Sequence, residues 1–300
     1  MASERVAVAG ASGMIGRALA RRLEREGHTV LRLVRRAPKI AGEVRWDPAA
    51  GSVDAAALEG VDAMVNLAGE NVGERWTAER KRRIRESRAD ATALLAGALA
   101  GLQRKPRVWV NASAVGIYGD RGDELLTEES APGGGFLAGV VREWEAATRP
   151  AADAGIRVVL PRFGVVLSVA GGALGKMLTP FKLGVGGPMG SGKQWMSWIS
   201  LDDAVEVVLR ALRDQRLTGP VNAVAGAATN EQFSHTLGRV LGRPAIIPVP
   251  AFGLKLAFGE MAEETILASQ RVEARVLQGI GHAFHHPDLD AALRAAIKED

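Results

Sequence analysis

The stretch Val6-Ala7-Val8-Ala9-Gly10-Ala11-Ser12-Gly13-Met14-Ile15-Gly16-Arg17 decides the fold, because it predicts a buried strand, a glycine turn and a helix in succession. Gly10 lets the chain turn tightly off the strand, and Gly13 lets backbone N–H groups approach a pyrophosphate. Gly16 lets the helix pack closely on the sheet. A turn with a purely structural role is the alternative, and the apolar run before the glycines argues against it. The stretch therefore predicts a cradle for a dinucleotide.

The phosphates of such a ligand are held by N–H groups at the start of the helix and by the positive end of the helix dipole. The expected phosphate-binding residues are Gly10, Ser12, Gly13, Met14, Ile15 and Gly16.

A second strand, predicted over 28–34, ends at Arg35 and Arg36. In dinucleotide-binding folds an acidic residue near this point takes the ribose 2′-hydroxyl, whereas arginine accommodates a 2′-phosphate. Guanidinium groups match phosphate geometry, so the two arginines favour NADP(H) over NAD(H) as the cofactor. A solvated basic loop is the alternative.

Composition narrows the class of protein. The chain has 300 residues and no cysteine, which excludes disulfides, thiolate metal sites and cysteine nucleophiles. It has no apolar run of about 18 residues, so we expect no membrane span, no signal peptide and a cytoplasmic location. The net charge is +4, but Glu79 and Glu86 interrupt the one dense basic cluster, 75–88. This pattern indicates a solvated helix face and no nucleic-acid partner.

Apolar runs alternate with helical segments through the first half, the pattern of a parallel sheet covered on both faces. The predicted strands are 6–9, 28–34, 43–47, 61–69, 108–113, 156–163 and 220–224. The predicted helices are 77–99 with one break, 136–152, 202–212, 230–241 and 252–259.

From about Gly164 the sequence becomes rich in glycine and proline, and 171–192 is expected to be an irregular segment that passes over the site. We expect an NADP-binding domain from 1–165 with a returning segment, 200–228, and a substrate-side lobe from 166–199 and 229–300. The predicted fold class is α/β, a Rossmann-type doubly wound parallel sheet with a smaller C-terminal α/β lobe.

Ligands of open parallel sheets bind beyond the carboxyl ends of the strands. Besides the glycine turn and the two arginines, residues at those ends are expected to contact the cofactor. They are Asp47 at the adenine, Asn66, Leu67, Ala68 and Gly69 on the adenosine side, Ser113 near the nicotinamide, and Pro161, Arg162 and Phe163.

The turn 10–16 and the segments 66–69, 113–119 and 192–203 together resemble extended short-chain dehydrogenases/reductases, which include sugar-nucleotide epimerases and dehydratases. With 136–145 and 260–262, nearly the whole chain is similar to an atypical branch called epimerase family proteins, some of them labelled cell-division inhibitors. The resemblance implies an NADP(H)-binding Rossmann domain and a small C-terminal lobe. It supplies no physiological substrate.

The resemblance also implies a tyrosine acid/base with a lysine four residues later, and a serine or threonine for the substrate oxygen. Tyr118 is the one tyrosine, and Gly122 lies four residues after it. The helix in which the pair would fall begins with 135–139, which holds neither residue. Ser113 either binds a carbonyl or the nicotinamide ribose, or only ends a strand. The catalytic candidates are Ser113 and Tyr118.

Charged and aromatic side chains near the strand ends are candidates for a substrate pocket. Glu143 and Glu145 are further titratable groups, and neither has a lysine at a useful spacing. His282, His285 and His286 have no acidic or cysteine ligand set beside them, so no metal is expected. The expected pocket residues are Glu70, Asn71, Arg162, Lys193, Trp195 and Trp198.

The leading hypothesis is an NADP(H)-dependent oxidoreductase or epimerase-like enzyme that acts on a small carbonyl or hydroxyl compound. The rival is a catalytically silent NADP(H)-binding sensor or regulator, with cell division as one setting. A sugar-nucleotide binding module is a third alternative. The small-molecule substrate is unknown, and self-association into a homo-oligomer is left open.

Overall fold

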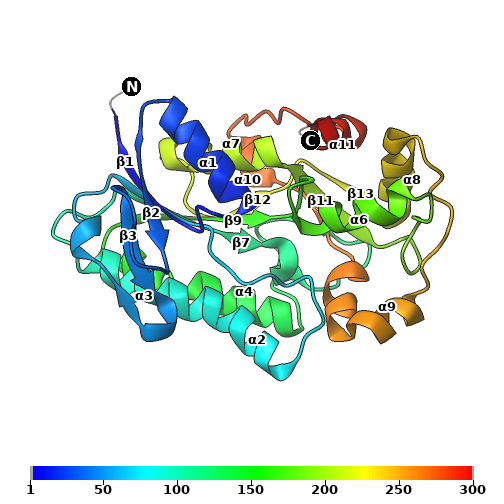
Figure 1. Ribbon diagram of the computed structural model, residues 1–300, viewed down its shortest axis with the longest axis horizontal. Coiled ribbons are helices and arrows are strands. Elements are labelled where there is room, and N and C mark those ends of the chain that lie inside the picture. The colour runs from blue at the N-terminus through cyan, green and yellow to red at the C-terminus, as the bar shows by residue number, and fades with distance from the viewer. Residues whose placement is uncertain (1–2, 299–300) are drawn as a thin grey trace.

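The computed structural model describes residues 3–298, and a mainly parallel sheet of nine strands within that range forms its centre (Figure 1). The strands are β1 (Arg5–Ala9), β2 (Thr29–Val34), β3 (Glu43–Asp47), β4 (Ser52–Val53), β5 (Ala63–Asn66), β6 (Val108–Asn111), β7 (Ser113–Ala114), β9 (Arg157–Phe163) and β12 (Gly219–Ala223). Their order is β12-β9-β6-β5-β1-β2-β3-β4, with β7 beside β9. β1 lies between β2 and β5, so the order reverses there, and such a reversal is where open α/β sheets bind ligands.

Helices cover both faces of this sheet. On one face α1 (Met14–Arg25) and α7 (Leu201–Arg213) pack on Val6 and Val8, and on the other α3 (Ala91–Ala100) and α5 (Arg149–Asp153) pack on Ala7 and Ala9. Because successive side chains of a strand point to opposite faces, two covered faces require the continuous apolar runs seen in the sequence. α2 (Ala78–Arg85) and α4 (Phe136–Ala146) lie with α3 below the sheet in Figure 1.

A smaller lobe is built around a second sheet of β10 (Val165–Leu167), β11 (Trp195–Ser200) and β13 (Gly226–Thr229). Its separate core includes α6 (Gly172–Lys182), α8 (Asn230–Leu241) and α11 (Leu289–Lys298). The remaining elements are β8 (Leu125–Leu126), which pairs with β14 (Arg271–Val272), and the helices α9 (Ala251–Phe258) and α10 (Arg275–Gly279).

The predicted fold class is confirmed. β3 has its predicted bounds, and β2 and β9 each begin one residue later than predicted. The predicted long helix is α2 and α3, joined by a π-helical turn at Glu86–Asp90 that supplies the expected break. The division into two domains stays a prediction.

One prediction of local structure was wrong, and one strand was not predicted. The segment 171–192 was expected to be irregular, but it contains α6, whose Leu174, Leu178 and Phe181 recur at helical spacing and are buried. The density of glycine and proline hid that pattern. The segment 195–200 was assigned no regular structure, and it forms β11, which pairs with β10 and β13.

Candidate functional site

The turn between β1 and α1 forms a cradle that only glycine can build at two positions. Gly10 has φ +77°, and a Cβ there would lie 2.6 Å from the carbonyl carbon of Leu67. A Cβ on Gly16 would lie 2.2 Å from the carbonyl oxygen of Gly10. Gly13 is exposed and precedes α1, and no side chain of the described residues caps the first N–H groups of that helix. The residues present therefore suit a pyrophosphate held by backbone N–H groups.

The end of β5 supports the cradle through Asn66, which is 1% exposed. Its Nδ2 donates hydrogen bonds to Oδ1 of Asn111 at 2.7 Å and to Oγ1 of Thr92 at 3.2 Å. Its Oδ1 accepts one from the backbone N–H of Ala68 at 3.2 Å. These bonds fix the turn through Leu67 that faces Gly10, so Asn66 supports the cradle from within the protein.

The two arginines after β2 have different surroundings. Both guanidinium nitrogens Nη1 and Nη2 of Arg36 are bonded to the carboxylate of Glu43. Arg36 and two backbone N–H groups lower the pKa of Glu43 to about 2. Arg35 is exposed and forms no ion pair or side-chain hydrogen bond within residues 3–298. Of the two, Arg35 is therefore the one whose charge is available to a ligand.

Asp47 ends β3 and begins the short 3-10 helix Pro48–Ala50. Its Oδ1 accepts a hydrogen bond from the N–H of Ala50 at 3.3 Å, and its Oδ2 lies 3.1 Å from Nη2 of Arg45. Local structure already uses this carboxylate, and its contact with adenine stays a prediction.

A buried polar network joins the two catalytic candidates to Arg162. Ser113 donates a hydrogen bond to Oε1 of Glu145 at 2.5 Å. Nε and Nη2 of Arg162 donate to the two oxygens of the same carboxylate, each at 2.8 Å. Nη1 of Arg162 donates to the hydroxyl oxygen of Tyr118 at 3.0 Å, and Tyr118 donates to Oδ1 of Asn222 at 2.7 Å.

The charges in this network are fixed by their environment. The side chains of Arg162 and Glu145 are 7% and 12% exposed. Burial lowers the pKa of Arg162, but the bonds and charge of Glu145 outweigh that effect and keep the pKa above its usual value. Burial also raises the pKa of Tyr118, which is 0% exposed. Tyr118 is thus a neutral core residue with both roles of its hydroxyl taken, a placement that argues against contact with a substrate.

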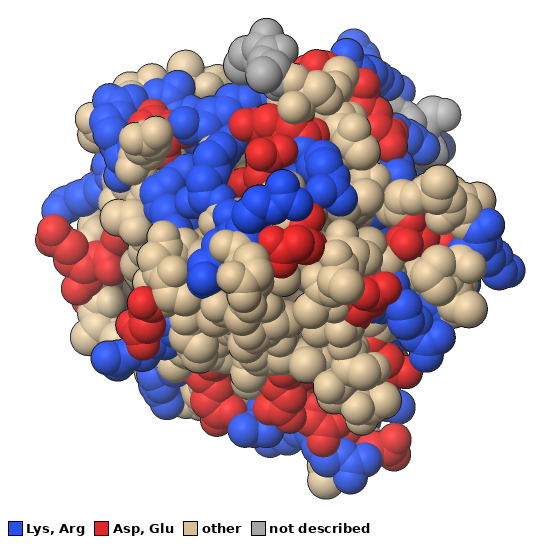
Figure 2. All heavy atoms as spheres, turned by 90° about the vertical axis from the view of Figure 1, so that its left-hand side faces the viewer, with Lys and Arg blue, Asp and Glu red and all other residues tan. Residues whose placement is uncertain are grey.

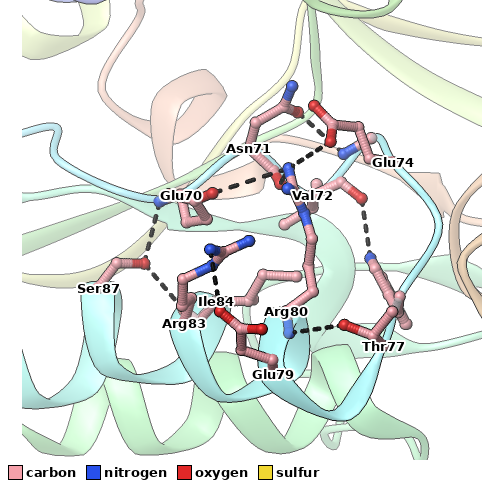
Figure 3. A network of polar contacts seen from close by, with 12 residues as sticks. Glu70, Asn71, Val72, Glu74, Thr77, Glu79, Arg80, Arg83, Ile84 and Ser87 are labelled. Carbon is pink, nitrogen blue, oxygen red and sulfur yellow. Dashed lines mark hydrogen bonds and ion pairs between the residues drawn. The ribbon is translucent and has the colours of Figure 1, made fainter.

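The loop after β5 is held against α2 by Arg80 (Figure 3). Nη2 of Arg80 donates to the carbonyl oxygen of Asn71 at 3.1 Å and lies 2.9 Å from Oε2 of Glu74. It lies 3.7 Å from Oε1 of Glu70, whose backbone N–H donates to Oγ of Ser87 at 3.0 Å. The expected pocket residues Glu70 and Asn71 are therefore both bonded to the helix beneath them.

Arg88 holds the same loop from below. Its Nη2 donates to the carbonyl oxygen of Glu70 at 3.0 Å, and its guanidinium lies 5.3 Å from the ring centre of Trp144. Burial lowers the pKa of Arg88 to about 10, so it is charged at neutral pH. A Cβ on Gly69 would lie 3.2 Å from the guanidinium carbon, which accounts for the small residue there.

The remaining expected pocket residues do not form one pocket. Trp198 is 2% exposed in the core of the smaller lobe, and Lys193 is exposed in the segment before β11. Nε1 of Trp195 donates to Oδ1 of Asp123 at 2.9 Å. Arg162 is held by Glu145, and its neighbours in β9, Pro161 and Phe163, are buried. The structure therefore does not gather these residues into the expected basic, aromatic pocket. Arg162 and Trp195 bond to different partners, and Trp198 is buried in another core.

Comparison with known proteins identifies the family. The model of the NAD dependent epimerase/dehydratase family matches residues 6–224. This chain belongs to that family. A domain of unknown function, DUF1731, matches residues 249–296 of this epimerase-family chain. The predicted membership is confirmed, and the cell-division label stays a prediction.

Relatives extend over almost the whole epimerase-family chain. An epimerase family protein of Mycobacterium bovis is 45% identical over 295 residues, which are 98% of this chain and 97% of the relative. The human epimerase family protein SDR39U1 is 39% identical over 302 residues, which are 98% of this chain and 99% of the relative. A crystal structure of human SDR39U1 isoform 2 with NADPH superposes with a TM-score of 0.90 at 36% identity, covering 99% of this chain and 100% of that one.

The epimerase-family chain has an unforeseen carboxylate where the tyrosine–lysine pair was sought. The Glu264 oxygens accept hydrogen bonds from the backbone N–H groups of Phe136 and Leu137, each at 2.8 Å. Gly135, before them, has φ +95°, and a Cβ there would lie 2.9 Å from Cδ of Glu264. Glu264 lies 128 residues along the chain from Phe136, so no local pattern indicates this contact.

The basic cluster of the epimerase-family chain is largely neutralised. In 75–88, Arg82 and Arg83 pair with Glu86 and Glu79 one turn away, and Arg85 pairs with Glu143. Figure 2 shows blue and red side chains interspersed on the face that it presents. Within residues 3–298 no helix is long and apolar enough to cross a bilayer, and no three His, Asp or Glu side chains are grouped to bind a metal.

Proposed function

We propose that this chain is an NADP(H)-binding oxidoreductase or epimerase-like enzyme that acts on a small carbonyl or hydroxyl compound in the cytoplasm. The carrying observation is Arg35, an exposed guanidinium with no ion-pair partner in the described chain, at the end of β2 and beside a glycine cradle. A crystal structure of a relative that is 36% identical contains NADPH, which supports the choice of cofactor.

The cofactor residues follow from the geometry of the cradle. Backbone N–H groups of the turn 10–16 would hold the pyrophosphate, and Arg35 would hold the 2′-phosphate. Leu67 and Ala68 face Gly10 and would flank the adenosine side. The nicotinamide ring supplies hydride chemistry when bound, so the chain must orient the ligand and handle one proton.

Ser113 follows β6 at the carboxyl edge of the sheet, where we expect it to orient a ligand, and Glu145 fixes its hydrogen-bonding direction. Its hydroxyl donates a hydrogen bond to Oε1 of Glu145, whose carboxylate is held by Arg162. The oxygen of Ser113 consequently offers lone pairs, so it accepts a hydrogen bond from a hydroxyl or N–H group. In this arrangement Ser113 would position a ligand by accepting a hydrogen bond from it. Its hydroxyl would have no hydrogen left to donate to a carbonyl oxygen of the ligand.

A catalytically silent NADP(H) sensor is the second candidate function, and it is favoured by the lack of a tyrosine–lysine pair. Tyr118 is fully buried, and 135–139 holds no tyrosine or lysine, so the described site contains no tyrosine–lysine pair. A protein of this kind would bind NADP(H) as tightly as an enzyme and turn over no substrate.

The cofactor assignment is tested by calorimetry with NADPH and NADH on the parent chain, Arg35→Ser and Arg36→Ser. We expect the parent to prefer NADPH at least about tenfold, because hydrogen bonds to a charged group are involved. Arg35→Ser should remove most of that preference. Arg36→Ser is the matched control and should remove less, since Arg36 is bonded to Glu43. Equal affinities of the parent for both cofactors would refute the assignment.

Enzyme and sensor are separated by turnover. NADPH oxidation is followed at 340 nm with aldehydes and ketones, and NADP⁺ reduction with alcohols and sugar nucleotides. Turnover that falls in Ser113→Ala at unchanged NADPH affinity supports the enzyme. No turnover with any compound, together with NADPH-dependent capture of a partner protein, supports the sensor.

A further inference from the structure

A groove along the outer side of α1 adjoins the cofactor cradle, with which it shares Met14. It has a volume of about 1060 Å³ and is walled by α1, the first turn of α7, residues 168–170 and the segment 285–286. A smaller groove of about 660 Å³ continues along α7 and shares Glu206 and His285 with it. α1 and α7 lie side by side on the upper face of the sheet in Figure 1. Arg35, the proposed 2′-phosphate residue, follows β2 and does not line this groove. The larger volume lies slightly above the range of about 300–1,000 Å³ typical of sites for small organic ligands.

Four arginines of α1 line the larger groove, and three of them have no counter-charge. Arg22 is neutralised by Glu26 at 2.6 Å and Glu206 at 2.8 Å. The other three, Arg17, Arg21 and Arg25, form no ion pair and no side-chain hydrogen bond within residues 3–298. The one carboxylate of the lining without an ion pair in the described chain is Asp202. The groove therefore carries an excess of positive charge.

This arrangement is unfavourable for α1 itself. Arg17, Arg21 and Arg25 stand at i, i+4 and i+8, and like charges at that spacing destabilise a helix. The first turn of α1 also lacks an acidic residue, so nothing there offsets a cation near the positive end of the dipole. In α2, by contrast, the charge of Arg83 is paired with Glu79 one turn away. Arg25, in the last turn, is favoured by the helix dipole, whereas Arg17 and Arg21 have no such compensation. Charges left uncompensated within the chain are characteristic of a functional site.

The opposite wall is firmly anchored. The buried carboxylate of Asp203 accepts hydrogen bonds from the backbone N–H groups of His285 at 2.6 Å and His286 at 3.1 Å. It also accepts one from Oγ of Ser200 at 2.7 Å. The groove is thus formed before any ligand arrives, and its polar lining is rich in hydrogen-bond donors.

We propose that this groove, which adjoins the cofactor cradle at Met14, is a second binding site for a phosphorylated small molecule with at least two anionic groups. Successive arginines are about 6 Å apart along the helix, so the row spans about 12 Å and suits an oligophosphate rather than a single ion. Guanidinium groups bind phosphate oxygens in bidentate fashion. A bound oligoanion would reverse the repulsion along α1, so the proposal accounts for the charge pattern as well as the groove.

The test uses the full chain and sodium tripolyphosphate as the probe, with titrations at constant ionic strength. The parent should bind it saturably, and Arg21→Ser should bind about tenfold more weakly, because charged hydrogen bonds are lost. The triple variant of Arg17, Arg21 and Arg25 to Ser should show no binding. Arg149→Ser is the control, since Arg149 is an exposed helical arginine on α5, and it should bind like the parent.

Two further measurements identify the site. Arg21→Glu should raise the thermal midpoint of the ligand-free protein, because it creates opposite-charge pairs with both neighbours, and should abolish tripolyphosphate binding. NADPH affinity should be the same in the parent and in the triple variant.

Several results would overturn the proposal. Tripolyphosphate binding that survives in the triple variant places the anion elsewhere. An equal loss of NADPH affinity makes the groove part of the cofactor site. Tighter, length-dependent binding of duplex DNA to the same arginines marks a nucleic-acid surface instead.

Discussion

Replacing Glu145 by Leu should be among the most destabilising single changes in this protein. The carboxylate is 12% exposed and accepts two hydrogen bonds from Arg162, which is 7% exposed, and one from Ser113. Its removal leaves a buried guanidinium with Tyr118 as its remaining bonded partner in the described chain. Breaking one side of a buried ion pair in this way costs about 3–5 kcal/mol.

A substitution that keeps a polar side chain at position 145 should destabilise the protein less. Glu145→Gln keeps one acceptor oxygen for Arg162, so we expect a loss of about 1–3 kcal/mol. The double change Glu145→Leu with Arg162→Met removes both charges and should cost at least about 2 kcal/mol less than the sum of the single changes. Asp153→Ala is the matched control, because its pair with Arg149 is 3.6 Å long and exposed on both sides. It should cost no more than about 0.5 kcal/mol.

The assay is equilibrium unfolding in urea, followed by circular dichroism, with the free energy of unfolding taken from each midpoint and slope. A loss below about 1 kcal/mol for Glu145→Leu, or strictly additive effects in the double variant, would show that the pair is not buried and coupled as described.

Two other expectations concern carboxylates that bind backbone N–H groups. Arg36 and the local N–H groups lower the pKa of Glu43 from 4.5 to about 2, so its contribution to stability is present above pH 4.5 and is lost as the pH falls towards 2. Glu43→Gln should flatten the pH dependence of the unfolding midpoint in that window, and an unchanged acid limb would count against the pair. Glu264→Ala should cost about 1–2 kcal/mol, through the lost cap and dipole interaction of α4, and should speed amide exchange at Phe136 and Leu137. Glu263→Ala, which removes an exposed partner of Lys255, should leave those amides unchanged.

Much of the fold was predictable because its signals are local. Both faces of the large sheet are covered, so its central strands are continuous apolar runs, and the glycines at 10, 13 and 16 mark the turn that follows β1. α6 and β11 were missed for a different reason. Glycine and proline dominate the sequence around α6, and β11 is defined by pairing with β10 and β13, which are distant in sequence.

The site was less predictable because its side chains bond to residues that are distant in the sequence. Ser113 and Glu145 are 32 residues apart, and Arg162 lies 17 residues beyond Glu145. Arg35 and Arg36 are equivalent in the sequence, and they differ once β2 and β3 bring Glu43 to one of them. Sequence spacing predicted which residues follow the strand ends where a ligand is expected. Which of them stay free to bind it depends on tertiary contacts.

The absence of a tyrosine at the start of α4 also reflects tertiary contacts. At the start of α4, where the superfamily pair was sought, Gly135 has φ +95° and lies against the Glu264 carboxylate. A side chain at that position would adopt a rarely occupied backbone conformation and would also collide with Glu264. A tyrosine therefore cannot be placed at position 135 by a single substitution, because the backbone conformation and the Glu264 carboxylate exclude a side chain there. Whatever proton chemistry this protein performs must then use groups other than a tyrosine of α4, because that helix contains none.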